Sequence, residues 1–318
     1  MKYRKLGSTG IEVSEIGFGA WGIGGLSNGA TSYGETDDNE SKRSLRRAYD
    51  LGITFYDTSN LYGYGHSEEL IGEELHDVRD KIKIASKVGF LEHRGPQDFS
   101  EAYVRESIEG TLKRLRTDYL DLYQLHSPDI ELLRAQPDLI ETFRTLQKEG
   151  KLKAFGISIR HPNDGLIAIN DLGFGVIQVN FNMIDQRALE NGLFKLAAQK
   201  DVGIIARTPL AFGFLTGAIK DTKFNERDHR SVWSEAQLKR WVEAPDMFTF
   251  INRDKDRTPC QLALKFCLGF PAVATVIPGM LHPSEVEENA AAADKEPLSE
   301  EELSNVELVY RQHTFFEK

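Results

Sequence analysis

The chain has 318 residues, of which 40% are hydrophobic and 28% are charged, and this balance excludes a chain that is disordered throughout. Its formal net charge of −10 at pH 7 would repel a phosphate backbone or an anionic membrane surface, so we expect neither nucleic acid nor a membrane as a partner. A small molecule is the expected partner, and the sequence does not indicate an oligomeric state.

No apolar segment approaches the roughly 20 residues that a membrane-spanning helix needs, and the first residues lack the apolar stretch of a signal peptide. We therefore expect a cytoplasmic protein. The two cysteines, Cys260 and Cys267, fall on one predicted helix about two turns apart, which is too far for a disulfide. We expect both to be buried apolar residues, and we expect no metal site.

The first dozen residues are typical of a small β-hairpin that turns at Gly7 to Gly10. Beyond it, short apolar runs typical of strands alternate with amphipathic stretches typical of helices. One such helix is expected over residues 101–115, with Ser100 as its N-cap, and another over residues 234–242 inside a long loop. The eight expected strands cover residues 16–20, 53–56, 82–85, 119–125, 153–157, 176–179, 202–206 and 273–277.

Strands that alternate with helices pair in parallel, which leaves either an open doubly wound sheet or a closed barrel. Polar residues decide between them, because they recur at the carboxyl ends of the expected strands. In a barrel these ends meet at one mouth, whereas in an open sheet they would be spread too widely to share one small ligand. We therefore predict an eight-stranded parallel (β/α) TIM barrel with an N-terminal β-hairpin, as one domain over residues 1–318. The polar positions are Asp57, Lys87, His126, Ser158, Gln178, Asn180 and Arg207, and the turn residues Pro278 and Gly279 follow the eighth strand.

Gly17, Gly19 and Gly22 match the G-x-G-x-x-G sequence pattern of a dinucleotide-binding fingerprint. Its chemistry requires a helix to begin there, so that the helix N-terminus can hold a pyrophosphate. The glycine-rich residues that follow, including Asn28 and Gly29, favour a loop instead. We therefore expect no Rossmann-type site at this motif.

The segment from Asp57 to Tyr62 carries the most informative chemistry. A carboxylate at the mouth needs a partner, and Lys87 at the end of the next strand can supply it. The pair alone could simply close the barrel. A tyrosine beside the lysine ammonium changes this interpretation, because the positive charge favours the phenolate and makes Tyr62 a proton donor. His126 adds a neutral hydrogen-bonding group, although a lone histidine is more often a satisfied core residue.

These residues and their spacing resemble the aldo-keto reductase family, and the resemblance covers nearly the whole chain. The active-site segment, with Ser67 and Glu68, is followed in the family's order by further matching motifs. They lie at Ser86 and Lys87; at Leu125, His126, Pro128 and Asp129; at Gly156 to Ser158; at Gln178 and Asn180; at Pro209 to Gly217; and at Ile277 to Gly279 through Asn289.

The resemblance implies that Asp57, Tyr62, Lys87 and His126 form a catalytic tetrad and that NAD(P)H binds in an extended form. It also implies that Ser158 and Gln178 hold the nicotinamide carboxamide, while Gly213 and Leu215 line the pyrophosphate loop. The full set of expected cofactor-binding residues is Ser158, Gln178, Arg207, Pro209, Leu210, Gly213, Leu215, Gly217, Pro278, Gly279, Glu285 and Asn289.

Three departures from the family's pattern bear on the cofactor. Arg207 stands where many members carry a tyrosine that stacks on the nicotinamide, and Ile159 stands where an asparagine often follows the serine. Leu281, His282 and Glu285 replace residues that favour NADP in many members. Because residues 279–289 contain three glutamates and no Arg or Lys, we expect weak discrimination, or NAD used at least as well as NADP.

The expected reaction is hydride transfer between NAD(P)H and an aldehyde, ketone or sugar-like carbonyl or alcohol, with Tyr62 as general acid or base. We expect Trp21, Phe90, His126 and Trp233 to form the substrate wall. A Schiff-base aldolase using Lys87 is a weaker alternative, because Asp57 would keep that lysine charged. A cofactor-binding regulatory subunit with little turnover is the second alternative, and the intact tetrad argues against it. The sequence gives neither the physiological substrate nor the favoured direction.

Overall fold

The computed structural model describes residues 1–26, 32–252 and 256–317, so the expected loop residues Asn28 and Gly29 lie outside the described part of the chain. Within that part, eight strands form one parallel sheet in the order β10-β9-β8-β7-β6-β5-β4-β3. Parallel bridges from Ile16 to Val276 and from Gly19 to Gly279 bring the two edges of the sheet together. The sheet is therefore a barrel, as predicted, and the open-sheet alternative is wrong.

The strands of the barrel follow the predicted apolar runs closely. The clearest differences are at two strands: the run predicted over residues 16–20 forms a continuous strand only at Phe18 and Gly19, and the run predicted over residues 82–85 extends to Val88. The strands are β3 (Phe18–Gly19), β4 (Phe55–Asp57), β5 (Lys83–Val88), β6 (Leu120–His126), β7 (Leu152–Ser158), β8 (Val176–Asn180), β9 (Gly203–Arg207) and β10 (Val273–Ile277).

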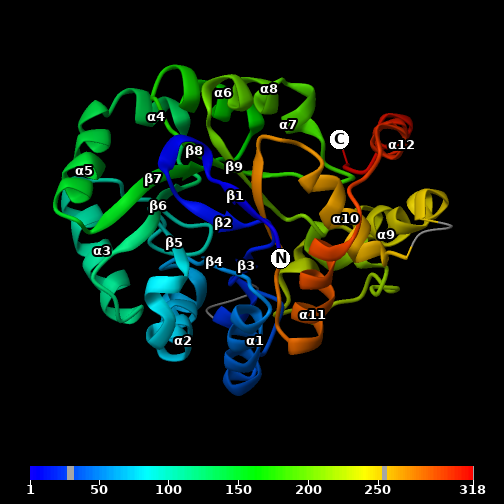
Figure 1. Cartoon of the computed structure of the whole chain (residues 1–318), viewed down its shortest axis with the longest axis horizontal. Helices are drawn as coiled ribbons and strands as arrows, with labels where there is room; N and C mark the ends of the chain where they lie inside the picture. The colour runs from blue at the N-terminus through cyan, green and yellow to red at the C-terminus, as the bar shows by residue number, and fades with distance from the viewer. Residues whose placement is uncertain (27–31, 253–255, 318) are drawn as a thin grey trace.

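Helices surround the barrel, as Figure 1 shows. The N-cap Ser100 of α3 accepts a hydrogen bond from the Tyr103 amide, and Ser234 caps α9 in the same way, which confirms both predicted helix starts. The α-helices are α1 (Asp38–Asp50), α2 (His66–Leu75), α3 (Glu101–Arg114), α4 (Ile130–Arg134), α5 (Pro137–Lys148), α6 (Pro162–Asn170), α7 (Arg187–Glu190), α8 (Leu193–Lys200), α9 (Glu235–Glu243), α10 (Pro259–Leu268), α11 (Pro283–Ala291) and α12 (Glu300–Gln312).

The predicted N-terminal hairpin consists of β1 (Tyr3–Lys5) and β2 (Glu12–Ser14), joined by the short 3-10 helix η1 (Gly7–Thr9). In Figure 1 this hairpin, in blue, lies in front of the barrel strands. Its apolar side chains join the interior of the barrel in one buried cluster, which closes the end of the barrel opposite the mouth. The cluster comprises Leu6, Ile11, Val13, Phe55, Ala85, Leu122, Ala154, Val176, Ile205, Ala274 and Ile277.

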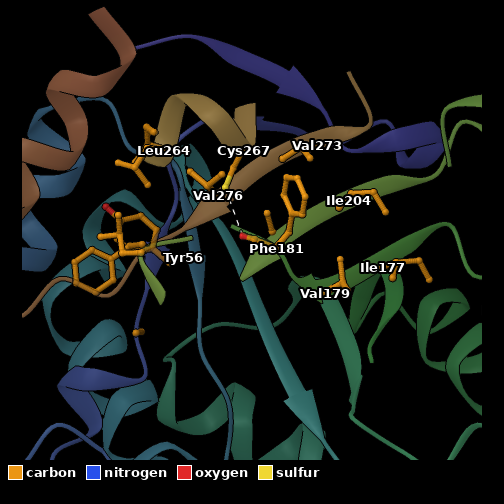
Figure 2. Packing of buried hydrophobic residues seen from close by; sticks show 14 of the residues in the cluster. Tyr56, Ile177, Val179, Phe181, Ile204, Leu264, Cys267, Val273 and Val276 are labelled. Atoms are coloured by element: carbon orange, nitrogen blue, oxygen red, sulfur yellow. Dashed lines mark hydrogen bonds between the residues drawn. The ribbon is translucent and has the colours of Figure 1, made fainter. Parts of the chain in front are cut away.

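A second, larger apolar core lies between the barrel and its helices. Figure 2 shows a part of it, where Cys267 lies beside Val276 and its sulfur donates a hydrogen bond to the Phe181 carbonyl oxygen at 3.4 Å. Cys260 and Cys267 are both buried and unbridged, as predicted. No helix in the described part of the chain is long and apolar enough to span a membrane.

Candidate active site

A cavity of about 660 Å³ opens at the carboxyl end of the barrel, within the size range of small-molecule sites. Its wall includes most of the residues that the sequence singled out. These are Trp21, Asp57, Tyr62, Phe90, His126, Gln178, Arg207, Pro209, Leu210, Gly213, Pro278, Gly279, Glu285 and Asn289. The predicted site residues that do not form part of the wall are Lys87, Ser158, Leu215, Gly217 and Trp233.

Lys87 on β5 lies at the centre of a buried polar network under the cavity floor. Its Nζ donates hydrogen bonds to the Asp57 carboxylate, to the Thr58 carbonyl oxygen at 2.9 Å and to Tyr62 Oη at 3.2 Å. Burial is the largest single influence and lowers the pKa of Lys87, but the charges of Asp57 and Tyr62 and the hydrogen bonds to both residues together outweigh burial and raise the pKa overall. The Lys87 side chain therefore stays protonated, and its ammonium group contacts the phenol hydroxyl of Tyr62.

Two glutamine amides hold the Asp57 carboxylate from the side away from Lys87. Gln178 Nε2 donates to Asp57 Oδ2 at 2.7 Å, and Gln124 Nε2 donates to the same oxygen at 3.1 Å. Gln124 was missed in the sequence, although it is a polar residue inside an apolar strand, two positions before His126 and thus on the same face. These amides and Lys87 together compensate the carboxylate, which is only 2% exposed.

His126 ends β6 and lines the cavity next to Tyr62. Its Nδ1 lies 3.2 Å from Ser59 Oγ, and the ring of Phe90 meets it edge-on with the ring centroids 5.0 Å apart. Burial, and then the positive charge of Lys87, hold the pKa of His126 well below its usual range. The imidazole is therefore neutral, with Nε2 left for a ligand when Nδ1 is occupied by the Ser59 hydroxyl.

Tyr62 is carried by the 3-10 helix η3 (Tyr62–Gly65), which requires a glycine at its second position. Gly63 has φ +61°, and a Cβ there would come within 2.2 Å of the Gly24 carbonyl oxygen. Below the loop, the buried carboxylate of Glu68 accepts hydrogen bonds from Ser86 Oγ at 2.5 Å and from Arg114 Nε at 2.7 Å. This pairing ties α2 to α3 and to β5, and so fixes the segment that places Tyr62 over Lys87.

The wall opposite His126 is formed by the loop after β9. The backbone of this loop is strained, because Thr208, Ala211 and Phe212 all have positive φ values between 46° and 60°. Gly213 follows with φ +93°, and the short helix η5 (Ala211–Thr216) leads into Gly217. Such backbone strain persists only where the surrounding structure holds it. Here it is concentrated on the side of the cavity where the family resemblance implies the pyrophosphate.

The far end of the cavity is closed by the start of α11. Glu285 Oε2 accepts hydrogen bonds from the backbone amides of Leu281 at 2.6 Å and His282 at 3.2 Å, which forms a capping box. Asn289 also lines this end, and its Oδ1 accepts a hydrogen bond from Cys260 Sγ at 2.9 Å. Cys260 therefore borders the cavity, which sequence reasoning did not predict, while burial raises the pKa of its thiol and keeps it protonated.

The donors along this wall suit an extended dinucleotide. Gln178 presents an amide near the tetrad, the Gly213 loop offers backbone close to the cavity, and Glu285 and Asn289 stand at the far end. Ser158 lies just behind the wall, with its Oγ 3.5 Å from Ser127 Oγ. The segment of Gly17, Gly19 and Gly22 leads into the 3-10 helix η2 (Gly22–Gly24) and not into an α-helix, which confirms that it is not a Rossmann fingerprint.

The aromatic wall of the cavity is formed by Trp21 and Phe90, both of which were predicted. Trp233 lies one layer further back, where its ring packs on Phe212 with the centroids 4.8 Å apart and on Trp241 at the same separation. It supports the wall through Phe212, which lines the cavity.

His229 also supports this wall, and its environment makes a testable prediction about pH. Its ring packs against Trp21 and Tyr33 with centroids 4.5 and 4.8 Å apart. Burial lowers its pKa from 6.5 to about 4. The unfolded chain therefore takes up a proton at a higher pH than the folded chain, and the folded state loses stability as the pH falls from about 6.5 to about 4.

We expect the His229→Phe variant, which keeps an aromatic ring but cannot titrate, to lose less stability on acidification. The difference from the unmodified protein should reach about 2 kcal/mol between about pH 7 and about pH 5. Urea denaturation of both proteins at the two pH values measures it. An equal loss of stability in both proteins would show that His229 titrates normally in the folded state.

Known proteins resemble this chain in both sequence and fold. The model of the Aldo/keto reductase family matches residues 15–311 of the chain. The aldo-keto reductase YhdN of Bacillus subtilis is 31% identical over 299 residues, which cover 90% of this chain and 87% of that protein. The structure of aldo-keto reductase AKR11C1 from Bacillus halodurans (holo form) is 30% identical with a TM-score of 0.78, covering 97% of this chain and 96% of that one. The glycerol dehydrogenase AKR11B4 from Gluconobacter oxydans is 25% identical with a TM-score of 0.83, covering 99% and 97%.

Proposed function

Because the chain belongs to the aldo/keto reductase family, we propose that it transfers a hydride reversibly between NAD(P)H and an aldehyde, ketone or sugar-like carbonyl, with Tyr62 as general acid. The observation that carries the proposal is the 3.2 Å contact between Tyr62 Oη and the buried ammonium of Lys87, which Asp57 holds in turn. The description of one similar structure as a glycerol dehydrogenase supports a small hydroxylated compound as the substrate.

In the proposed mechanism, each member of the tetrad moves or stabilises one charge. The bound reduced nicotinamide supplies the hydride. The Tyr62 phenol gives its proton to the carbonyl oxygen as negative charge develops there, and the Lys87 ammonium stabilises the phenolate that remains. Asp57 keeps Lys87 charged and in place, and the neutral ring of His126 orients the carbonyl oxygen through Nε2. The oxidation direction uses the same groups in reverse.

The cofactor would lie along the wall that runs from Gln178 past the Gly213 loop to Glu285 and Asn289. We propose that Gln178 and Ser158 hold the carboxamide end, with Arg207 beside the nicotinamide. Gln178 is already bonded to Asp57, so it also couples the position of the cofactor to the tetrad.

Steady-state oxidation of NADPH and of NADH with a panel of aldehydes, ketones and aldoses tests this function. We expect carbonyl-dependent loss of the reduced cofactor with at least one class of substrate. Quenching of the protein's fluorescence by the cofactor is measured in parallel. Tight cofactor binding without carbonyl-dependent oxidation across the panel would contradict the proposal and favour the regulatory-subunit alternative.

For the choice of cofactor, we propose weak discrimination, or use of NAD at least as good as NADP. Glu285, fixed by its capping bonds, and Glu288 both line the far end of the cavity, where they would repel a 2′-phosphate. His282 stands beside them, with its Nδ1 3.7 Å from the Glu40 carboxylate. We therefore predict that His282→Arg raises the NADP-to-NAD ratio of kcat/KM by roughly tenfold, because a guanidinium can form charge-assisted bonds with the phosphate.

Specificity constants for both cofactors at a saturating carbonyl concentration measure this ratio. The matched control is His313→Arg, which adds the same charge at an exposed histidine beyond α12. A preference for NADP of ~10²-fold in the unmodified protein would overturn the proposal, because the phosphate would then have a binding site that these residues do not explain.

A further inference from the structure

Cationic side chains gather around the end of the cavity that holds the tetrad. Arg94 and Arg207 line this end together with His93 and His126, and His93 is a neutral ring near pH 7 because burial and the Arg94 charge lower its pKa. Arg160 stands directly behind it, where its Nε donates to the Ser127 carbonyl oxygen at 2.7 Å and its guanidinium also bonds Gln97 Oε1 at 3.0 Å. The cluster thus comes from three different segments, namely the loop after β5, the loop after β7 and the end of β9.

These arginines lack the partners that arginines elsewhere in the molecule have. Across the residues that the structure describes, only Arg94, Arg160, Arg207 and Arg240 form no ion pair with a carboxylate. Three of these four belong to the cluster, in a chain whose acidic residues outnumber the basic ones, 49 to 39. Carboxylates were therefore available in the sequence, but among the described residues the one carboxylate that lines this end of the cavity is Asp57, which Lys87 neutralises.

Two of the cluster's nitrogen atoms are both buried and unsatisfied. Arg207 donates one hydrogen bond, from its guanidinium to the Ile159 carbonyl oxygen at 3.0 Å, but its buried Nε has no partner. The buried Nε2 of His93 has none either. An unpaired buried donor costs free energy that a bound acceptor would recover, and a cationic donor recovers most from an anion.

The carboxylates of the cavity are distributed in the opposite way. Asp57 is neutralised by Lys87, and the remaining acidic residues of the wall, Glu285 and Glu288, lie at the α11 end. The charges of Arg207 and Arg160 also act on His126, because they add to burial and Lys87 in lowering its pKa. The field at the reacting end is thus positive, and it reaches the group expected to orient the substrate.

We propose that the preferred substrate carries an anionic group, a carboxylate or a phosphate ester, that Arg94 and Arg207 bind while its carbonyl faces Tyr62 and His126. This inference rests on the proposed reductase function and specifies its substrate class. Arg160 adds positive potential without direct contact being required. Guanidinium groups suit both kinds of anion, because each presents paired oxygens to the fork of nitrogen donors.

Matched pairs of substrates that differ in the anionic group test the proposal. The pairs are succinic semialdehyde with butanal, and glyceraldehyde 3-phosphate with glyceraldehyde. We expect kcat/KM to be at least roughly tenfold higher for the anionic member of one pair or both, through a lower KM. The advantage should shrink as the ionic strength rises, because salt screens the exposed guanidinium of Arg94.

The variant Arg94→Ala should lower the anionic-to-neutral ratio of kcat/KM by about tenfold, and Arg94→Lys should restore part of it. Arg94 is exposed on the loop after β5, so truncating its side chain removes no buried packing. The matched control is Arg240→Ala, because Arg240 is also unpaired but lies on α9, where it bonds the Thr314 carbonyl oxygen. We expect Arg240→Ala to leave the ratio unchanged.

The results of these experiments distinguish failure of the anionic substrate class from failure of the reductase function. Equal or better turnover of the neutral members would overturn the anionic substrate class and leave the reductase function standing, with Arg207 then serving the cofactor alone. An anionic preference that Arg94→Ala does not reduce would overturn the assigned binding site. Failure to reduce any member of either pair, or of the wider panel, would overturn the proposed function and this inference with it.

Discussion

Replacing Tyr62 with phenylalanine is expected to lower kcat by at least ~10²-fold, with little change in cofactor affinity. The variant keeps the aromatic ring that meets His126 edge-on at 6.0 Å, but it removes the hydroxyl that contacts Lys87. Proton transfer to the carbonyl oxygen then has no donor at this position. Steady-state kinetics with the best carbonyl substrate measure the loss of turnover, and fluorescence titration measures the affinity for the cofactor.

Tyr64→Phe is the matched control, because Tyr64 belongs to the same short helix but is exposed. It should leave kcat nearly unchanged. Tyr56 is excluded as an alternative donor, because it is fully buried and its hydroxyl bonds the carbonyl oxygens of Leu45 and Ile53 at 3.3 Å. Near-normal turnover by Tyr62→Phe would show that another group protonates the carbonyl.

The second large effect is expected at Lys87. The Lys87→Met variant keeps a flexible apolar chain of similar length but removes the ammonium, so kcat should fall by ~10²-fold or more. It also leaves the buried Asp57 carboxylate with only its two glutamine donors, which should cost about 3–5 kcal/mol in the free energy of unfolding. Urea denaturation and steady-state kinetics measure the two losses.

The double variant Asp57→Asn with Lys87→Met separates catalysis from folding. Removing both charges together should recover most of the lost stability, because no unpaired ion remains buried, while turnover should stay low. Lys265→Met is the matched control, since Lys265 is a buried lysine of α10 that does not line the cavity. Recovery of turnover in the double variant would contradict the role assigned to the Lys87 charge.

The barrel could be predicted because its determinants are local and repeat. Each strand is a short apolar run, and Ser100 and Ser234 mark helix starts that depend only on nearby residues. The polar residues at the strand ends also indicated a shared barrel mouth. Because these ends meet there, the sequence alone predicts that Asp57 and His126 lie close together. These predictions needed only periodicity and the geometry of parallel strands.

What could not be predicted depends on contacts between distant segments. The hydrogen bond from Gln178 to Asp57 joins residues 121 positions apart, and no local pattern signals it. The same holds for Cys260, which borders the cavity because α10 packs beside α11. The arginine cluster is likewise invisible in the sequence, where Arg94, Arg160 and Arg207 are separated by long stretches of chain.

The family resemblance narrowed the chemistry but not the details of the cofactor site. Trp233 was expected at the substrate wall because aromatic residues often serve there, yet it packs behind Phe212. Its place depends on how the long loop after β9 folds back on itself, and that loop has no repeating pattern to read. Long connections of this kind are the part of a barrel that varies most.

Deuterium transfer from the cofactor shows whether the protein passes a hydride directly to the carbonyl carbon. The protein is incubated with a carbonyl substrate and with reduced cofactor deuterated at C4 of the nicotinamide, and the alcohol product is analysed by mass spectrometry. Direct hydride transfer predicts deuterium on the former carbonyl carbon of the product, and the rate of labelling should collapse in Tyr62→Phe. An alcohol product without deuterium, or bound cofactor that labels no carbonyl in the panel, would contradict the account.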